Sequence, residues 1–231
     1  QEMGYESPMP VQEEVIPFLL GDDNDVIALA QTGTGKTAAF GLPILQKIDV
    51  TTYHPQALVL CPTRELCLQI ADDLNDYSKY IDNLKVLPVY GGSSIESQIK
   101  TLKRGVHVVV ATPGRLLDLM NRKTVDLSLV KNVIMDEADE MLNMGFTDSI
   151  NAILAEVPEN RNMLLFSATM PKEIANITKK YMKNPKEIVI GNKNEGNKNI
   201  RDIYYMVQAR DKYLALKRIA DFYPNIYGIV F

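Results

Sequence analysis

Glycine residues near the start of the chain are spaced in a way that suits phosphate binding. The stretch Ala30–Thr37 reads Ala-Gln-Thr-Gly-Thr-Gly-Lys-Thr. An apolar run at Asp25–Ala30 predicts a buried strand before it, and the pattern over Lys36–Lys47 predicts a helix after it. Gly33 and Gly35 leave backbone N–H groups free to converge on anionic oxygens, and the helix start adds partial positive charge. The sequence therefore predicts a phosphate-binding loop.

The polar side chains of the same stretch fit a nucleoside triphosphate. Lys36 can reach the terminal phosphates, and the Thr37 hydroxyl can bind magnesium. The pattern departs from the strict P-loop consensus because Ala30 stands where the first glycine is usually written. The alternative is an ordinary turn with a solvated Lys36 and capping threonines, but a cation gains nothing from the positive helix end. The remaining candidate nucleotide-binding residues of the loop are Gln31, Thr32 and Thr34.

A cluster of acids follows a second apolar run. Asn132–Met135 predicts a buried strand, which ends in Asp136, Glu137 and Asp139. If this strand end lies near the phosphate loop, Asp136 can hold magnesium, largely through water, and Glu137 can deprotonate the attacking water. The alternative is a solvated acidic helix start, because Asp and Glu favour first turns. Together the two strings predict a nucleoside triphosphatase site in which Lys36, Asp136 and Glu137 carry the chemistry.

With these motifs the chain resembles the DEAD-box ATP-dependent RNA helicases, and further motifs follow in that family's order. The resemblance covers residues 4 to 190 and, more thinly, the remainder. The motifs, in chain order, are Gly4-Tyr5 with Pro8–Gln12, the phosphate loop, Pro62–Leu66, Gly91-Gly92, Thr112–Arg115, Asp136–Asp139 and Ser167–Thr169.

The first of these motifs resembles the family's adenine-reading Q motif. The Gln12 amide carries donors and an acceptor, so it can pair with two edges of adenine and refuse guanine. Tyr5 offers a flat face for the base, where the family more often has phenylalanine; the alternative is an aromatic staple before a helix predicted over Gln12–Leu20. The resemblance implies ATP and Mg²⁺ as cofactors.

Three further motifs each lie between an apolar segment and a helical one, after Ala57–Leu60, Val86–Tyr90 and Val106–Val110. Such junctions expose N–H groups, hydroxyls and a guanidinium, which suits the phosphates of a nucleic-acid strand and reads no bases. The resemblance implies that this strand is single-stranded or duplex RNA. The alternative is helix capping by threonine and serine, with both arginines in structural ion pairs. The resemblance implies RNA-binding roles for Pro62, Thr63, Arg64, Gly91, Gly92, Thr112, Pro113, Gly114 and Arg115. In the alternative, the capping residues are Thr63, Ser93 and Thr112.

Ser167-Ala168-Thr169 ends a strand predicted over Met163–Phe166. By resemblance its hydroxyls contact Asp139 and couple the nucleotide state to RNA opening, and two hydroxyls and a carboxylate can form such a network. An N-cap for the helix after Pro171 explains Thr169 equally well.

The composition fits a chain that buries one α/β core. The 231 residues are 46% hydrophobic, and no stretch is long enough to cross a membrane. Cys61 and Cys67 are too few for a disulfide framework, and His54 and His107 stand alone without metal-ligand spacing. We expect a cytoplasmic protein with reduced cysteines. The net charge of −4 argues against a broad basic face, so we expect this chain alone to bind RNA weakly.

Apolar strands alternate with amphipathic helices. Leu66, Ile70 and Leu74 share one helix face, as do Ile174 and Ile177. This alternation predicts a parallel sheet covered on both faces, with right-handed crossovers. The resemblance names the fold class as α/β, a RecA-like doubly wound parallel sheet.

Composition changes after residue 190. Residues 1–190 are predicted to form the ATP-binding domain, and residues 191–200, which are polar except at their last position, an interdomain linker. Residues 201–231 resemble the truncated beginning of a second RecA-like domain, including a helix around Tyr213–Phe222 and a strand at Ile226–Phe231. We expect that strand to be disordered or to dock on another molecule, because its edges are unpaired.

By resemblance, the second domain acts in cis and supplies arginines that stabilise the charge moving in phosphoryl transfer. We therefore expect this chain alone to bind nucleotide with little hydrolysis or unwinding. Taken together, the motifs predict an ATP-dependent RNA helicase. The alternatives are another P-loop enzyme such as a DNA translocase, and a non-enzymatic scaffold that keeps a nucleotide pocket.

Overall fold

The computed structural model describes residues 4–21, 25–31, 33–190, 203–223, 225 and 227–228. The chain divides into two compact units, residues 1–194 and residues 195–231. Thr32, the predicted linker at 191–200 and most of the predicted terminal strand at Ile226–Phe231 lie outside the described residues.

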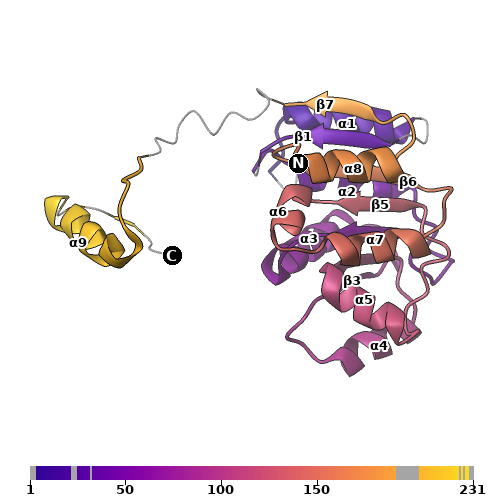
Figure 1. Cartoon of the computed structure of the whole chain (residues 1–231). Helices are drawn as coiled ribbons and strands as arrows, with labels where there is room; N and C mark the ends of the chain where they lie inside the picture. Colours follow the sequence, from indigo (N-terminus) through magenta and orange to yellow (C-terminus); the bar gives the residue numbers. More distant parts are fainter. Residues whose placement is uncertain are drawn as a thin grey trace. The chain divides into compact units, whose positions relative to one another are not determined.

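The first unit is built on a seven-stranded sheet (Figure 1), in which every described pairing is parallel. Its strand order is β3-β4-β2-β5-β6-β1-β7. The central strands of such a sheet read as continuous apolar runs because helices cover both faces. The strands are β1 (Val26–Leu29), β2 (Ala57–Leu60), β3 (Val86–Val89), β4 (Val108–Ala111), β5 (Asn132–Met135), β6 (Asn162–Ser167) and β7 (Lys186–Val189).

Helices cover both faces of this sheet. One face packs against α1 (Pro10–Leu20), α2 (Lys36–Gln46) and α3 (Arg64–Tyr77). The opposite face packs against α4 (Ile95–Lys103), α5 (Pro113–Asn121), α6 (Ala138–Asn143), α7 (Thr147–Glu156) and α8 (Lys172–Tyr181). Figure 1 shows α7 and α8 in front of the sheet. The predicted doubly covered parallel sheet is confirmed.

Alternation along each strand divides the core into two layers. In β1, Ile27 faces the layer of α5 to α8, whereas Ala28 faces the layer of α1 to α3. Phe40 of α2 packs on Phe166 of β6 in the second layer, with ring centroids 5.3 Å apart. This rigid base fixes where each strand ends, and so where the loops that follow the strands emerge.

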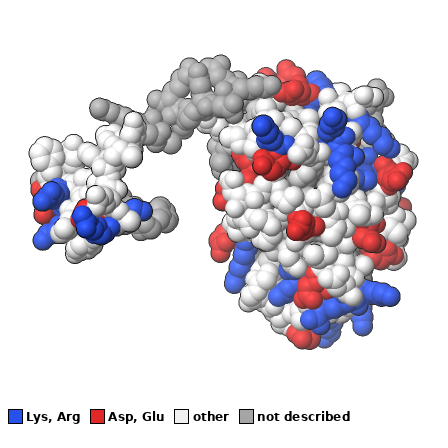
Figure 2. All heavy atoms as spheres, in the orientation of Figure 1, with Lys and Arg blue, Asp and Glu red and all other residues white. Residues whose placement is uncertain are grey.

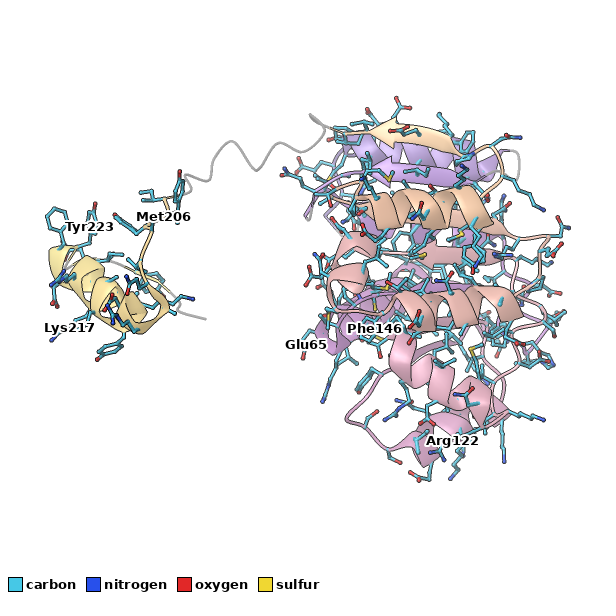
Figure 3. All side chains as sticks on the ribbon, in the orientation of Figure 1. Glu65, Arg122, Phe146, Met206, Lys217 and Tyr223 are labelled. Atoms are coloured by element: carbon cyan, nitrogen blue, oxygen red, sulfur yellow. The ribbon has the colours of Figure 1, made fainter. Side chains whose placement is uncertain are left out.

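The second unit contains a 3-10 turn, η1 (Ala209–Asp211), and α9 (Lys212–Phe222), which matches the predicted helix. Ile203–Val207 have no regular secondary structure, and none of the described residues of this unit is buried. Figure 3 shows Met206, Lys217 and Tyr223 projecting from it.

The surface of the described residues carries charges of both signs (Figure 2). No helix among them is long and apolar enough to cross a membrane. On the face that Figure 2 shows, Lys and Arg are interspersed with Asp and Glu.

His107 is fully buried and has a structural role. Its Nδ1 accepts a hydrogen bond from the Lys85 N–H at 3.0 Å, and its Nε2 lies 3.2 Å from the Val50 carbonyl oxygen.

Candidate functional site

Apart from the first motif, which precedes β1, the predicted motifs follow the carboxyl ends of strands, and these ends lie at one edge of the parallel sheet. The strand order divides them into two halves. The phosphate loop, the acids and the Ser167–Thr169 motif follow the neighbouring strands β1, β5 and β6. The three motifs predicted to hold RNA follow the neighbouring strands β2, β3 and β4. One sheet edge therefore carries a candidate phosphate half beside a candidate nucleic-acid half.

Lys36 and Asp136 form a buried pair in the phosphate half. Lys36 is 7% exposed and Asp136 is 3% exposed, and the Lys36 Nζ lies 3.5 Å from the Asp136 Oδ1. Burial raises the pKa of Asp136, and the Lys36 charge opposes that shift. The alternatives of a solvated lysine and a solvated acidic helix start are therefore wrong for these two residues. A buried ionisable group with a perturbed pKa and a specific charge partner is a candidate for a functional site.

The backbone of the phosphate loop is left-handed at both glycines, with φ of +78° at Gly33 and +80° at Gly35. Gly35 is the N-cap of α2 and no side chain caps this helix. The Thr34 hydroxyl donates to the Gln31 carbonyl at 2.8 Å, so it closes the loop on itself. A Cβ on Gly33 would meet no atom within 4 Å, so open space lies beside the loop.

Gln12 of α1 is hydrogen-bonded to the backbone of this loop. Its Nε2 donates to the Gly35 carbonyl at 3.1 Å, and its Oε1 accepts from the Met9 N–H at 3.0 Å. Met9 is the N-cap of α1, so the helix begins at Pro10, two residues before the predicted start. An amide has two N–H groups and two acceptor lone pairs, so one of each remains for a ligand. The predicted pairing with adenine stays a prediction.

Replacing Gly35 with alanine is expected to destabilise the fold more than replacing Gly33. Both positions have positive φ, which costs about 1–2 kcal/mol with a Cβ. Only at Gly35 would the Cβ lie 2.5 Å from the Gln12 Nε2 and 2.9 Å from the Met9 Sδ. Breaking the Gln12 contact adds about 1–3 kcal/mol. Urea unfolding of Gly35→Ala beside the matched Gly33→Ala measures the difference; equal losses would contradict the buttressing role of Gln12.

Tyr5 is 46% exposed, and its hydroxyl lies 3.0 Å from the Tyr77 hydroxyl of α3. Tyr77 thus fixes the side chain for which base stacking was predicted. Thr37 also has a partner on α3. Burial raises the pKa of Asp73, as do Asp76 and Asp72, whereas a hydrogen bond from Thr37 opposes the shift. The stacking and magnesium roles both stay predictions.

Glu137 occupies an unusual backbone conformation. Its φ of +50° and ψ of +50° place a non-glycine residue in the left-handed region, where it is the N-cap of α6. Such strain costs of order 1–3 kcal/mol and clusters at functional sites. Burial raises the pKa of the Glu137 carboxyl, and the neighbouring Asp136 charge adds to that shift.

Asp139 is hydrogen-bonded to both hydroxyl-bearing residues of the Ser167–Thr169 motif. Its backbone N–H donates to the Ser167 Oγ at 3.3 Å, and its Oδ2 accepts from the N–H and the hydroxyl of Thr169 at 2.9 and 2.7 Å. Pro171 is the N-cap of α8 and supplies no side-chain cap, so Thr169 does not cap that helix. The loop after β5 and the loop after β6 are thereby joined; the coupling role stays a prediction.

In the nucleic-acid half, Arg64 is the first residue of α3, and its side chain packs against the loop after β3. Its guanidinium stands 5.0 Å from the centroid of the Tyr90 ring, and its Nη1 would lie 3.5 Å from a Cβ on Gly92. Gly92 has a φ of +83°, and Gly91 beside it is exposed. Thr63 caps α3 by accepting from the Leu66 N–H at 3.2 Å, as the capping alternative predicted. Figure 3 shows Glu65 projecting from the start of α3.

Arg115 holds the same loop from α5. Its Nη1 donates to the Ser93 carbonyl at 3.1 Å and to the Gln98 Oε1 at 3.0 Å. Within the described residues, neither Arg64 nor Arg115 forms an ion pair, so that alternative is wrong.

Capping explains less of the nucleic-acid half than the alternative predicted. Ser94, not Ser93, caps α4. Thr112 makes no side-chain cap of α5, which begins at Pro113, and Gly114 is exposed.

Three residues of the site were not predicted: Gln98, Tyr77 and Tyr90. The sequence contains a signal for Gln98, because this residue lies three positions after Ile95 and four before Leu102. That spacing places it on the helix face that packs on the core. A polar residue on an apolar face requires partners.

Comparisons with known proteins agree with one another. A family model described as DEAD/DEAH box helicase matches residues 9–177. Over all of this chain, identity is 49% to "ATP-dependent RNA helicase DeaD" of Mycobacterium tuberculosis and 46% to "DEAD-box ATP-dependent RNA helicase CshA" of Bacillus cereus. The chain spans only 40% and 44% of those proteins. A crystal structure of a DEAD box protein from Methanococcus jannaschii is 43% identical with a TM-score of 0.78, over 95% of this chain and 58% of that one.

Proposed function

This chain belongs to the DEAD/DEAH box helicase family, and from that premise we propose that it is the ATP-binding part of an ATP-dependent RNA helicase. The fold is the RecA-like doubly wound sheet of that family. The observation that carries the proposal is the buried Lys36–Asp136 pair, which joins the phosphate loop to the acids at 3.5 Å. A phosphate that arrives beside Lys36 supplies a competing anion, and the pair can then part.

In this proposal each residue of the phosphate half has one task. Gln12 and Tyr5 select and stack adenine, and the backbone N–H groups around Gly33 and Gly35 hold phosphate oxygens. Lys36 neutralises the terminal phosphates. Glu137 takes the proton from the attacking water as the bond to the leaving phosphate breaks.

The acids also fit a magnesium ion. Mg²⁺ prefers oxygen ligands and is commonly held by one or two carboxylates together with water and substrate phosphates. Asp136 is a buried carboxylate beside a hydroxyl-bearing loop, and no group of three or more His, Cys, Asp or Glu residues that could cage a metal occurs in the described part of the chain. Asp136 and Thr37 would hold the ion. When bound, it would neutralise charge on the phosphates.

The nucleic-acid half supports a nucleic-acid backbone as the partner, and the names of the relatives favour RNA. Its donors are guanidiniums, hydroxyls and backbone N–H groups at strand ends, which contact phosphates without reading sequence. Because relatives of this chain are more than twice as long, we assign residues 1–190 to the ATP-binding domain, 191–200 to the linker and 201–231 to the start of a second RecA-like domain that acts in cis. The free buried thiols of Cys61 and Cys67 support a cytoplasmic location.

Turnover of ATP by a form extended through the second domain tests the proposal. Single-stranded RNA is expected to stimulate phosphate release, and DNA of the same sequence is expected to stimulate it far less, because a 2′-hydroxyl distinguishes the two. Equal stimulation by both would favour a DNA translocase. ATP binding without turnover under any condition would favour a scaffold.

A further inference from the structure

Gln98 connects two of the motifs in the nucleic-acid half. It is 6% exposed, although it is polar and lies on the core-facing side of α4. Its Nε2 donates to the Ser93 Oγ at 2.7 Å and to the Tyr90 carbonyl at 3.2 Å, and its Oε1 accepts from Arg115 at 3.0 Å. One amide thus ties the loop after β3 to the arginine of α5. Only an amide side chain offers two donors and an acceptor at one carbon.

Both acceptors that hold Arg115 are neutral. One Nη1 nitrogen donates to the Ser93 carbonyl and to the Gln98 amide oxygen, and no carboxylate in the described part of the chain pairs with it. Glu96, on the first turn of α4, interacts with Arg115 through its charge. Its carboxylate accepts a hydrogen bond from the Ser94 hydroxyl at 2.9 Å. The guanidinium is therefore held by neutral acceptors, with no carboxylate of the described residues hydrogen-bonded to it.

A charged group that is removed from water is commonly paired with an opposite charge, because the pair satisfies both hydrogen bonding and charge. Neutral acceptors satisfy hydrogen bonding alone. They leave the full charge for an external anion while they remove the freedom of the side chain, and this reduces the entropy lost on binding.

We infer that Gln98 is a positioning residue that holds Arg115 for a nucleic-acid phosphate without neutralising it. The inference deepens the proposed RNA binding and rests on it. Gln98 does not touch the nucleic acid; it acts through Arg115 and through the loop that carries Gly91 and Gly92.

Two substitutions at Gln98 separate the effect of the position of Arg115 from the effect of its charge. Gln98→Glu keeps the length and the acceptor for Arg115 but adds a negative charge against it. Gln98→Met keeps the volume, removes the hydrogen bonds and leaves the charge of Arg115 intact. Gln46→Glu is the matched control, because Gln46 is exposed at the last residue of α2, at the opposite end of that helix from the phosphate loop, and receives the same added charge.

The measurement is the affinity of each variant of this chain for labelled oligouridine across a salt titration, starting at low ionic strength. Gln98→Glu is expected to bind about 10- to 100-fold more weakly. It should also lower the slope of log affinity against log salt by about 0.7, the value of one lost phosphate contact on a single strand. Gln98→Met is expected to weaken binding about 2- to 10-fold with the slope unchanged. Gln46→Glu should change neither quantity.

A double variant that combines Gln98→Glu with Arg115→Gln tests whether Gln98 acts through Arg115. If Gln98 acts through Arg115, adding Gln98→Glu to Arg115→Gln causes no further loss of affinity. An unchanged salt slope in Gln98→Glu, or full affinity in Gln98→Met, overturns the inference while RNA binding by the unmodified chain stands. Absence of RNA binding by the unmodified chain at low salt overturns the proposed function and this inference with it. Thermal unfolding of each variant shows that it is folded.

Discussion

Phosphate release from ATP by this chain alone is expected to be about three to five orders of magnitude slower than release by a form extended through the whole second domain. That factor is the typical contribution of an arginine that stabilises the transferring phosphoryl group. The described phosphate half contains Lys36 as its buried cation. We assign the missing arginines to the second domain. Steady-state assays of both forms, with and without single-stranded RNA, measure the difference.

The control is nucleotide binding by the short form. Calorimetry should show that this chain binds ATP, so that slow turnover reflects a missing catalytic group and not an empty site. Comparable turnover in the two forms would mean that this domain hydrolyses ATP by itself. The two-domain mechanism would then be wrong.

Glu137→Gln in the extended form is expected to lower RNA-stimulated turnover about 10²- to 10⁴-fold, the usual contribution of a general base. The substitution preserves size and removes the carboxylate that takes the proton. Burial and the neighbouring Asp136 charge raise the pKa of Glu137, which makes its carboxylate a better proton acceptor. ATP binding should remain, because the phosphate contacts are assigned to the glycine loop and Lys36.

Glu140→Gln is the matched control. Glu140 lies three residues further on, is exposed on α6, and loses the same charge. It should leave turnover within about twofold, since exposed charges at a distance are screened. Equal losses in both variants would show that the effect is a general change of charge near the site.

The central strands were predictable because their residues face apolar layers on both sides. Asn132–Met135 and Ala57–Leu60 are observed with the predicted bounds. The strand predicted at Val106–Val110 instead spans Val108–Ala111. Its pairing sets this shift, because the partner strand begins at Val86, opposite Val108. A bound set by a distant partner is not encoded in the local pattern.

The site was predictable where a motif combines backbone and side-chain chemistry, and less so where contacts cross between elements. Lys36 and Asp136 are a hundred residues apart in sequence and 3.5 Å apart in space, as the combined motifs implied. The contact of Thr37 with Asp73, and that of Gln98 with Arg115, depend on how helices pack. No spacing rule links those residues, so only the structure reveals them.

The division of the sheet edge has a consequence for how such proteins can diversify. Substitutions in the loops after β2, β3 or β4 can change how the protein binds a nucleic acid, while the loops after β1, β5 and β6 keep their geometry. The reason is that the effects of substitutions at separate sites are nearly additive. The hydrolytic chemistry can then be inherited unchanged while the substrate repertoire evolves. One scaffold can therefore give rise to many specialised descendants.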